Sequence, residues 1–384
     1  MGQLEQRVLT LLNRLIDAQA VPSIVCGIAD SSGTLARASA GVQNSQTKQV
    51  MTNESIVAIA SMTKPITTVA VLQLFEQGLV GLDNPVSDYL PELAGLKLRV
   101  GFDRKGRQQL KTIDAPPTLR QLLTHTSGFV YEIWNKNAQI AVTSGQSESA
   151  FSAGGLDVPL DFEPGERWEY GIGIDWAGRV VERISGKSLD VYFADHIFQP
   201  LGMKDTAFSV PEEQQHRHAD IHRRGPDGFH PEPKFALSVS GGGGLQSTVD
   251  DYILFMRCIL NQGQCNGGRL LQADTVKLML MNQIGNLTVG PVQSRMSAMS
   301  CDFDLTFSRG GKWSLGFLLH DSNLPEGRSA GSVSWAGLFN SFFWIDSDRD
   351  LCAVIATQLL PFCEPAAINM LTEFEHLVYS ECKR

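Results

Sequence analysis

The chain has 384 residues, of which 43% are hydrophobic and 19% are charged. These proportions are typical of a soluble globular protein and exclude a mostly disordered one. The net charge of −9 opposes binding to phosphate backbones and anionic lipid surfaces, so nucleic acid is not an expected partner. The longest apolar run, Leu351–Phe362, is too short to cross a bilayer, so no membrane span is expected.

The first 20 residues predict an amphipathic helix and not a signal peptide. Leucines alternate with charged residues and no uninterrupted apolar stretch is present. The residues expected on the apolar face are Leu4, Val8, Leu11, Leu12 and Ile16. The seven cysteines form no CxxC pair. Without an export signal, we expect reduced thiols and a cytoplasmic protein.

Strands are predicted towards both ends of the chain, and helices between them. VPSIVCGIAD and TLARASAG predict a strand pair that turns at 31–33. SIVAIASMTKPITTVAVLQLFEQG begins like a strand and continues as an apolar helix that stops at Gly78. Prolines then punctuate short helices and turns from Leu82 to Phe235. Further strands are predicted in KWSLGFLLH, FNSFFWID and LCAVIATQLL, and a last helix in AAINMLTEFEHLVYSECKR.

This order of elements predicts an α/β protein of the α+β type. Its antiparallel sheet would be assembled from the two ends of the chain and flanked by the terminal helices. Residues 1–81 and 236–384 would form this α/β domain, with a mainly helical domain inserted at 82–235 and the active site at their interface. A doubly wound parallel fold would instead alternate strands and helices throughout the chain.

Ser61-Met62-Thr63-Lys64 is the strongest candidate for a catalytic motif. Serine and lysine three residues apart share one face of a helix. A serine hydroxyl is a poor nucleophile until a base takes its proton. Because burial disfavours the charged form of lysine, a lysine within this apolar helix can act as that base. The same spacing also occurs by chance in surface helices, so the motif alone leaves catalysis open.

Further motifs in a fixed order resemble the serine β-lactamase and penicillin-binding-protein superfamily. The Ser-x-x-Lys motif is followed by LTHTSG, by Tyr170-Gly171-Ile172, by LGMKDT, by Gly241–Gly244 and by Trp335-Ala336-Gly337. Ser-x-x-Lys with the companion motifs Ser-Asp-Asn and Lys-Thr-Gly is typical of that superfamily, and the tyrosine and tryptophan motifs here are related but altered elements. The resemblance runs from about Val21 to near the C-terminus and is closest to the class C-like branch, the family VIII carboxylesterases and related transesterases.

The resemblance implies roles for individual residues. Ser61 would be the nucleophile, Lys64 its hydrogen-bonded partner and Tyr170 a second general base and acid. The backbone N–H groups of Ser61 and Leu338 would form the oxyanion hole. The residues expected to bind substrate are Trp335, Gly337 and Ile172.

Two positions depart from the β-lactamase pattern. Ile172 stands where those enzymes have an asparagine, and Trp335 stands where they have a lysine that pairs with the lactam carboxylate. Both changes remove polar anchors for a lactam or a peptide. The sequence therefore predicts a serine carboxylesterase that hydrolyses or transesterifies small-molecule esters through an acyl-Ser61 intermediate. A β-lactamase, a DD-peptidase or another amide hydrolase remains an alternative, and so does a catalytically silent binding protein.

Other candidate sites are weaker. Gly327–Gly331 matches G-x-S-x-G around Ser329, but it lacks the strand before it and the helix after it that this motif requires. The histidines between 216 and 230 lack further ligands, so no metal site is expected. The acidic residues at 346, 348 and 350 predict a turn between strands and not a calcium loop. His125 lies in the LTHTSG segment, which is structural in the resembled family. No nucleotide-binding motif is present, so no cofactor is expected.

Overall fold

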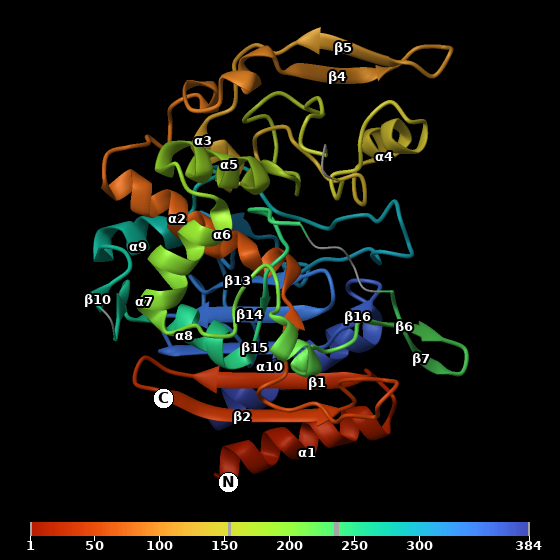
Figure 1. Ribbon diagram of the computed structural model, residues 1–384, viewed down its shortest axis with the longest axis vertical. Coiled ribbons are helices and arrows are strands. Elements are labelled where there is room, and N and C mark those ends of the chain that lie inside the picture. The colour runs from red at the N-terminus through yellow and green to blue at the C-terminus, as the bar shows by residue number, and fades with distance from the viewer. Residues whose placement is uncertain (1, 153–154, 234–237, 267, 383–384) are drawn as a thin grey trace.

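The computed structural model describes residues 2–152, 155–233, 238–266 and 268–382. Its helices are α1 (Gln3–Asp17), α2 (Thr63–Glu76), α3 (Leu119–Leu123), α4 (Lys136–Thr143), α5 (Gly173–Ser185), α6 (Leu189–Phe193), α7 (Gln199–Leu201), α8 (Val249–Leu260), α9 (Ala273–Leu280) and α10 (Pro365–Glu381). A short 3₁₀ helix, η1 (Ala60–Met62), leads directly into α2. Figure 1 shows the arrangement of these elements.

The strands form one large sheet and several short ribbons. They are β1 (Ser23–Ala29), β2 (Thr34–Gly41), β3 (Val57–Ala58), β4 (Lys97–Phe102), β5 (Gln108–Thr112), β6 (His222–Gly225), β7 (Gly228–Pro231), β8 (Gln246–Ser247), β9 (Gln264–Cys265), β10 (Gly268–Arg269), β11 (Lys312–Trp313), β12 (Leu318–Leu319), β13 (Val333–Gly337), β14 (Ser341–Asp346), β15 (Leu351–Ala356) and β16 (Leu359–Leu360). The large sheet has the antiparallel order β11-β12-β13-β14-β15-β1-β2. The expected sheet built from both ends of the chain is therefore confirmed.

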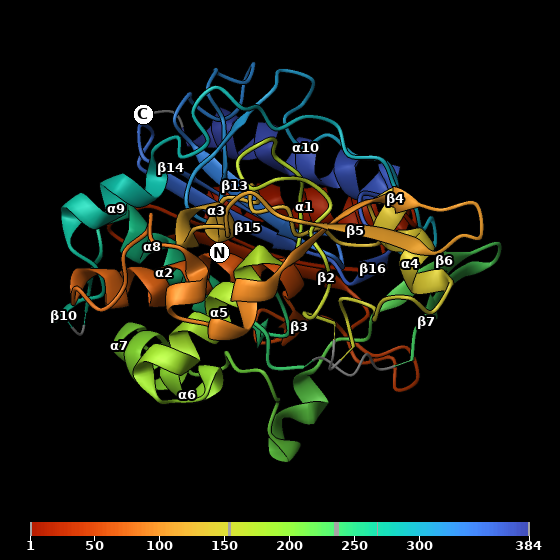
Figure 2. The ribbon, with the colours of Figure 1, turned by 90° about the horizontal axis from the view of Figure 1, so that it is seen from above.

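Helices cover both faces of this sheet (Figures 1 and 2). The terminal helices α1 and α10 pack against each other, and α1 also packs on β2, while α8 packs on β1, β14 and β15. Every residue of β1, β14 and β15 is buried, because neither face of these strands meets solvent. Gly27 allows α8 to approach closely, since a Cβ at this position would lie 2.3 Å from Ile253 Cδ1. The buried core thus extends across the whole centre of the sheet.

The structure corrects the sequence prediction in the late strands and the middle segment. KWSLGFLLH is not one strand, since β11 and β12 pair as a tight hairpin that turns at Gly316 with φ of +86°. The middle segment contains the ribbons β4-β5 and β6-β7 besides its short helices. The division into residues 1–81 with 236–384 and an insert at 82–235 stays a prediction.

Candidate active site

Ser61 lies at the bend between β3 and α2. Ala60 has φ of +44°, a left-handed conformation that is uncommon for residues other than glycine and that often marks functional sites. This bend turns the chain from the short strand into η1 and then into α2. Thr63 Oγ1 donates to Ala60 O over 2.7 Å and fixes the turn. Ser61 consequently stands at the N-terminal end of a helix and lines a cavity.

Lys64 is fully buried one helical turn after Ser61, as the Ser-x-x-Lys spacing predicts. Its Nζ lies 3.1 Å from Ser61 Oγ, 3.1 Å from the hydroxyl of Tyr131 and 2.6 Å from Gly242 O. An ammonium group has three N–H donors, and these three oxygens can accept all of them. In the neutral amine, two N–H groups can remain on Tyr131 and Gly242, which directs the lone pair towards the serine hydroxyl.

The glycine run at 241–244 lets the backbone come close to α2 and α5. A Cβ on Gly241 would lie 2.4 Å from Ile174 O, and a Cβ on Gly242 would lie 2.1 Å from Asp175 Oδ2. The close approach brings the carbonyl of Gly242 to Lys64 and the carbonyl of Gly241 to Thr67 Oγ1 at 2.6 Å. The run therefore supplies one of the three acceptors around the lysine.

Tyr131 connects Lys64 to Asp175, a link that the sequence analysis did not find. The Tyr131 hydroxyl donates to Asp175 Oδ2 over 3.1 Å while it accepts from Lys64. Burial, together with the negative charge of Asp175, raises the pKa of Tyr131 well above its ordinary value of 10. Tyr131 thus keeps its proton and works as a neutral donor. Asp175 also accepts from Ser240 and from the N–H of Gly242. The only signal in the sequence was the position of Tyr131 just after LTHTSG.

Tyr170 lies beside this network and contacts it through its ring. Lys64 Nζ is 4.9 Å from the centroid of the Tyr170 ring. The indole Nε1–H of Trp335 donates to the Tyr170 hydroxyl over 3.1 Å. Within the described residues, no hydrogen bond joins that hydroxyl to Ser61 or Lys64. The structure thus brings the ring of Tyr170 to Lys64, while the hydrogen bond to the lysine is made by Tyr131.

The end of β13 lies against the Ser61 bend. A Cβ on Gly337 would be 2.4 Å from Ile59 O, so glycine is required for this contact. The close approach brings the following residue, Leu338, to the cavity that Ser61 lines. Backbone N–H groups that converge beside a nucleophile are the usual donors of an oxyanion hole. Ser61 and Leu338 both line the cavity, and the role of their N–H groups as an oxyanion hole stays a prediction.

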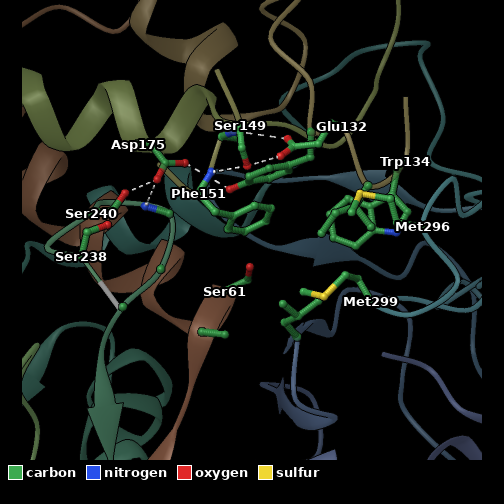
Figure 3. A pocket seen from close by; sticks show the side chains of 18 of the residues that line it. Ser61, Glu132, Trp134, Ser149, Phe151, Asp175, Ser238, Ser240, Met296 and Met299 are labelled. Carbon is green, nitrogen blue, oxygen red and sulfur yellow. Dashed lines mark hydrogen bonds between the residues drawn. The ribbon is translucent and has the colours of Figure 1, made fainter. Parts of the chain in front are cut away.

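The cavity above Ser61 has a volume of about 260 Å³. Figure 3 shows Ser61 on one side of it, the side chains of Trp134, Met296 and Met299 on another, and Glu132, Ser149, Asp175 and Ser240 together with the ring of Phe151 on the rest. The lining residues are Ala60, Ser61, Tyr131, Glu132, Ile133, Trp134, Ser149, Ala150, Phe151, Asp175, Ser238, Ser240, Gly242, Gly243, Gly244, Met296, Met299, Leu338 and Phe339.

The three residues expected to bind substrate are not in the lining of this cavity. Ile172 is fully buried at the beginning of α5, where its carbonyl accepts from the N–H of Asp175 over 3.0 Å. Trp335 is also buried and is hydrogen-bonded to Tyr170. Gly337 sets the position of the backbone against η1. Direct contact of these residues with a substrate remains a prediction.

His125 packs behind Tyr170, and the ring centroids are 4.6 Å apart. Its Nδ1 accepts from the N–H of Gly171 over 3.3 Å. Burial holds the pKa of His125 well below 6.5. The imidazole is therefore neutral and faces the backbone of the tyrosine loop, as a structural residue would.

The weaker candidate sites take ordinary structural roles. Ser329 lies in the loop between β12 and β13, as predicted, and its N–H donates to Asp346 Oδ2 over 2.8 Å. The acidic residues at 346–350 turn the chain between β14 and β15, also as predicted. His222 and His230 bind different neighbours, Ser45 and Asp227. Across the described residues, no three potential ligand side chains form a metal site, and no helix is long and apolar enough to cross a membrane.

Comparison with known proteins identifies the family. A profile described as Beta-lactamase matches residues 8–371. The chain belongs to the β-lactamase family. It is 31% identical over 346 residues to the monacolin J acid methylbutanoyltransferase of Aspergillus terreus. The aligned region covers 84% of this chain and 81% of that protein. It is 30% identical over 368 residues to the lovastatin esterase of Penicillium rubens, with coverage of 86% and 87%.

A solved structure has the same fold. The unliganded simvastatin synthase of Aspergillus terreus matches with a TM-score of 0.85 and 27% identity, and the match covers 100% of both chains. Similar members of this β-lactamase family thus include acyltransferases and an esterase.

Proposed function

We propose that this β-lactamase family member is a serine carboxylesterase, which transfers the acyl group of a small-molecule ester to Ser61 and then to water or an alcohol. The main support is the buried Lys64 amine 3.1 Å from Ser61 Oγ, beside a cavity of about 260 Å³. The names of its relatives, which include a methylbutanoyltransferase and a lovastatin esterase, support acyl chemistry in general.

The first half of the reaction follows from the contacts of Lys64. Ser61 Oγ would attack the ester carbonyl carbon while its proton passes to the lone pair of the neutral amine. Tyr131 and Gly242 O hold the remaining N–H groups during this step. The carbonyl oxygen would develop its negative charge towards the N–H groups of Ser61 and Leu338, where fixed donors are most effective. Collapse of the intermediate expels the alcohol, which takes up a proton, and leaves acyl-Ser61.

In the second half, water or a second alcohol would attack the acyl group and return the proton to Ser61. Tyr170 is our candidate for a second acid and base. Its hydroxyl is oriented by the indole N–H of Trp335, and its ring lies against Lys64. Hydrolysis and transfer to an alcohol share every step up to acyl-Ser61, so the two activities differ only in the acceptor.

We expect esters to be better substrates than lactams and peptides, because Ile172 and Trp335 stand where β-lactamases have a polar asparagine and a charged lysine. The side chain of Ile172 is fully buried and offers no amide to a substrate. Trp335 has no positive charge to pair with a lactam carboxylate. Loss of a charged hydrogen bond costs about 1.5–3 kcal/mol, or about 10- to 150-fold in specificity. An amide hydrolase is therefore the second choice, and a silent binding protein does not account for the Ser61–Lys64 contact.

The test compares esters and a lactam on one preparation. We expect kcat/KM for p-nitrophenyl butyrate, and for a less reactive alkyl butyrate, to exceed kcat/KM for nitrocefin at least a hundredfold. The Ser61→Ala variant should lose all three activities and its labelling by a fluorophosphonate. Addition of an alcohol then shows, by the ester formed, what share of the acyl-enzyme is transferred. If nitrocefin matches both esters, the β-lactamase alternative replaces this proposal.

A further inference from the structure

The cavity beside Ser61 has an uneven distribution of charge. The carboxylates of Glu132 and Asp175 line it, and no Lys, Arg or His is among the described lining residues. Asp175 already accepts from Tyr131, from Ser240 and from the N–H of Gly242. Lys64 is likewise held by three acceptors. Glu132 is therefore the carboxylate with capacity left for a ligand.

Glu132 is buried without a cation. The residue is 5% exposed to solvent, and within the described residues its carboxylate forms no ion pair. It accepts from Ser149 Oγ at 2.5 Å and from the N–H of Ala150 at 3.4 Å. Arg99, which lines a smaller adjoining pocket with Glu132, is already paired with Asp161 at 2.7 Å. Burying a carboxylate with two neutral donors and no counter-charge is costly, and a bound cation would offset that cost.

Three aromatic rings contribute to the wall of the same cavity. Tyr131, Trp134 and Phe151 all line it. Tyr131 meets the Trp134 ring edge to face, with centroids 5.7 Å apart, and stacks on Phe151 at the same distance. Phe151 is 53% exposed, so this aromatic group reaches the opening. Aromatic faces attract cations through their quadrupole, and such rings are a recurrent means of binding alkylammonium groups.

Building on the proposed function, we propose that the ester or acyl acceptor of this enzyme carries an alkylammonium group. The carboxylate of Glu132 attracts the positive charge, and the rings of Tyr131, Trp134 and Phe151 pack around the alkyl substituents. Figure 3 shows Glu132 and Ser149 on the side of the cavity away from Ser61, so the charge would lie at a distance from the reacting carbonyl. Met296 and Met299 add a polarizable apolar wall on the Trp134 side.

A purely structural role for Glu132 is the competing explanation. The hydrogen bonds to Ser149 and Ala150 hold the segment that carries Phe151, and this would need an acceptor but no charge. Glutamine removes the charge and keeps one acceptor oxygen, which can still accept from the N–H of Ala150, while its amide NH₂ can donate to Ser149 Oγ. The Glu132→Gln variant therefore separates the two roles, and Glu148→Gln is the matched control. Glu148 is the exposed neighbour of Ser149, and its replacement changes the net charge equally outside the cavity.

The experiment uses two butyrate esters of equal shape, choline butyrate and 3,3-dimethylbutyl butyrate. They differ in one atom, the positively charged nitrogen and its carbon equivalent. We expect the wild-type enzyme to favour the choline ester at least tenfold in kcat/KM, with a KM for that ester that rises with salt. Glu132→Gln should remove this preference, so that the kcat/KM values for the two esters agree within about twofold. Glu148→Gln should keep the preference.

Binding is measured separately from catalysis. Calorimetry on Ser61→Ala compares choline with 3,3-dimethylbutan-1-ol, and we expect tighter binding of choline that is lost in the Ser61→Ala, Glu132→Gln double variant. Equal binding of the two alcohols, or a wild-type preference for the neutral ester, overturns the proposal. So does an unchanged preference in Glu132→Gln. Tight choline binding without turnover of either ester would refute the esterase function and leave the cation site standing.

Discussion

The two tyrosines around Lys64 can be distinguished by removing one hydroxyl at a time. Tyr131→Phe deletes the oxygen that accepts from Lys64 and the proton that Asp175 accepts. Tyr170→Phe deletes only the hydroxyl that accepts from Trp335. If Tyr131 holds the amine and Tyr170 transfers a proton, the two variants should differ in size of effect and in pH dependence.

The expected losses follow from the contacts. A hydrogen bond to a charged group contributes about 1.5–3 kcal/mol, so Tyr131→Phe should lower kcat/KM for a butyrate ester about 10- to 150-fold. Removal of a general acid or base typically costs about 10²- to 10⁴-fold, so we expect Tyr170→Phe to be the more damaging. Asp175 retains two donors in Tyr131→Phe, Ser240 and the N–H of Gly242, so the fold should survive.

The assay is kcat/KM from pH 6 to 10 with thermal unfolding of each variant. Tyr192→Phe is the control, because Tyr192 is a buried tyrosine in α6 that does not line the cavity. The pH profile of the wild-type enzyme should show no change in activity due to titration of His125, because the pKa of His125 lies well below 6.5. Activity of Tyr131→Phe within threefold of wild type would refute the holding role. Wild-type activity of Tyr170→Phe would remove Tyr170 from the mechanism.

Three further outcomes test other parts of the structure. Ser329→Ala should keep wild-type esterase activity in the assay that Ser61→Ala fails, and a folded but inactive Ser329→Ala would contradict the choice of nucleophile. Gly337→Ala places a Cβ 2.4 Å from Ile59 O, so kcat should fall by roughly 10²-fold, the cost of losing one oxyanion donor, and an unchanged kcat would count against Leu338. Burial holds the pKa of His320 in the folded protein well below 6.5. As the pH falls, His320 therefore binds a proton in the unfolded protein before it does so in the folded protein. The free energy of unfolding should therefore decrease below pH 6.5 by up to about 1.4 kcal/mol per pH unit from this group. Urea titrations at pH 7.0 and 5.5 should show a smaller decrease in His320→Gln, and an equal decrease would refute this linkage.

The elements that sequence could predict are those governed by local pattern. The Ser61–Lys64 pair needs only the helical spacing of three residues, and the strands β1, β14 and β15 show as apolar runs bounded by turns. The hairpin of β11 and β12 was missed because its strands have two residues each, too few for any periodicity. Gly316 is what turns the chain there, yet a single glycine in an apolar run also fits a continuous strand.

Contacts between distant segments account for what the sequence could not predict. Tyr131 and Asp175 are 44 residues apart and meet only because α5 packs behind the lysine. Gly242, which lies 178 residues after Lys64, supplies a further acceptor for the Lys64 amine. The resemblance to a family predicted that Tyr170 and Trp335 belong to the site, but it predicted no contact for either residue. In the structure the two side chains are hydrogen-bonded to each other. Residue type can therefore indicate a candidate nucleophile and a candidate base, while the groups that hold the candidate base depend on how the chain folds around it. The residues that we propose to bind the charge of the substrate likewise lie outside the sequence motifs. Glu132, Trp134 and Phe151 occupy loops, where sequence pattern predicts neither exposure nor direction, and only the structure shows that all three line one cavity.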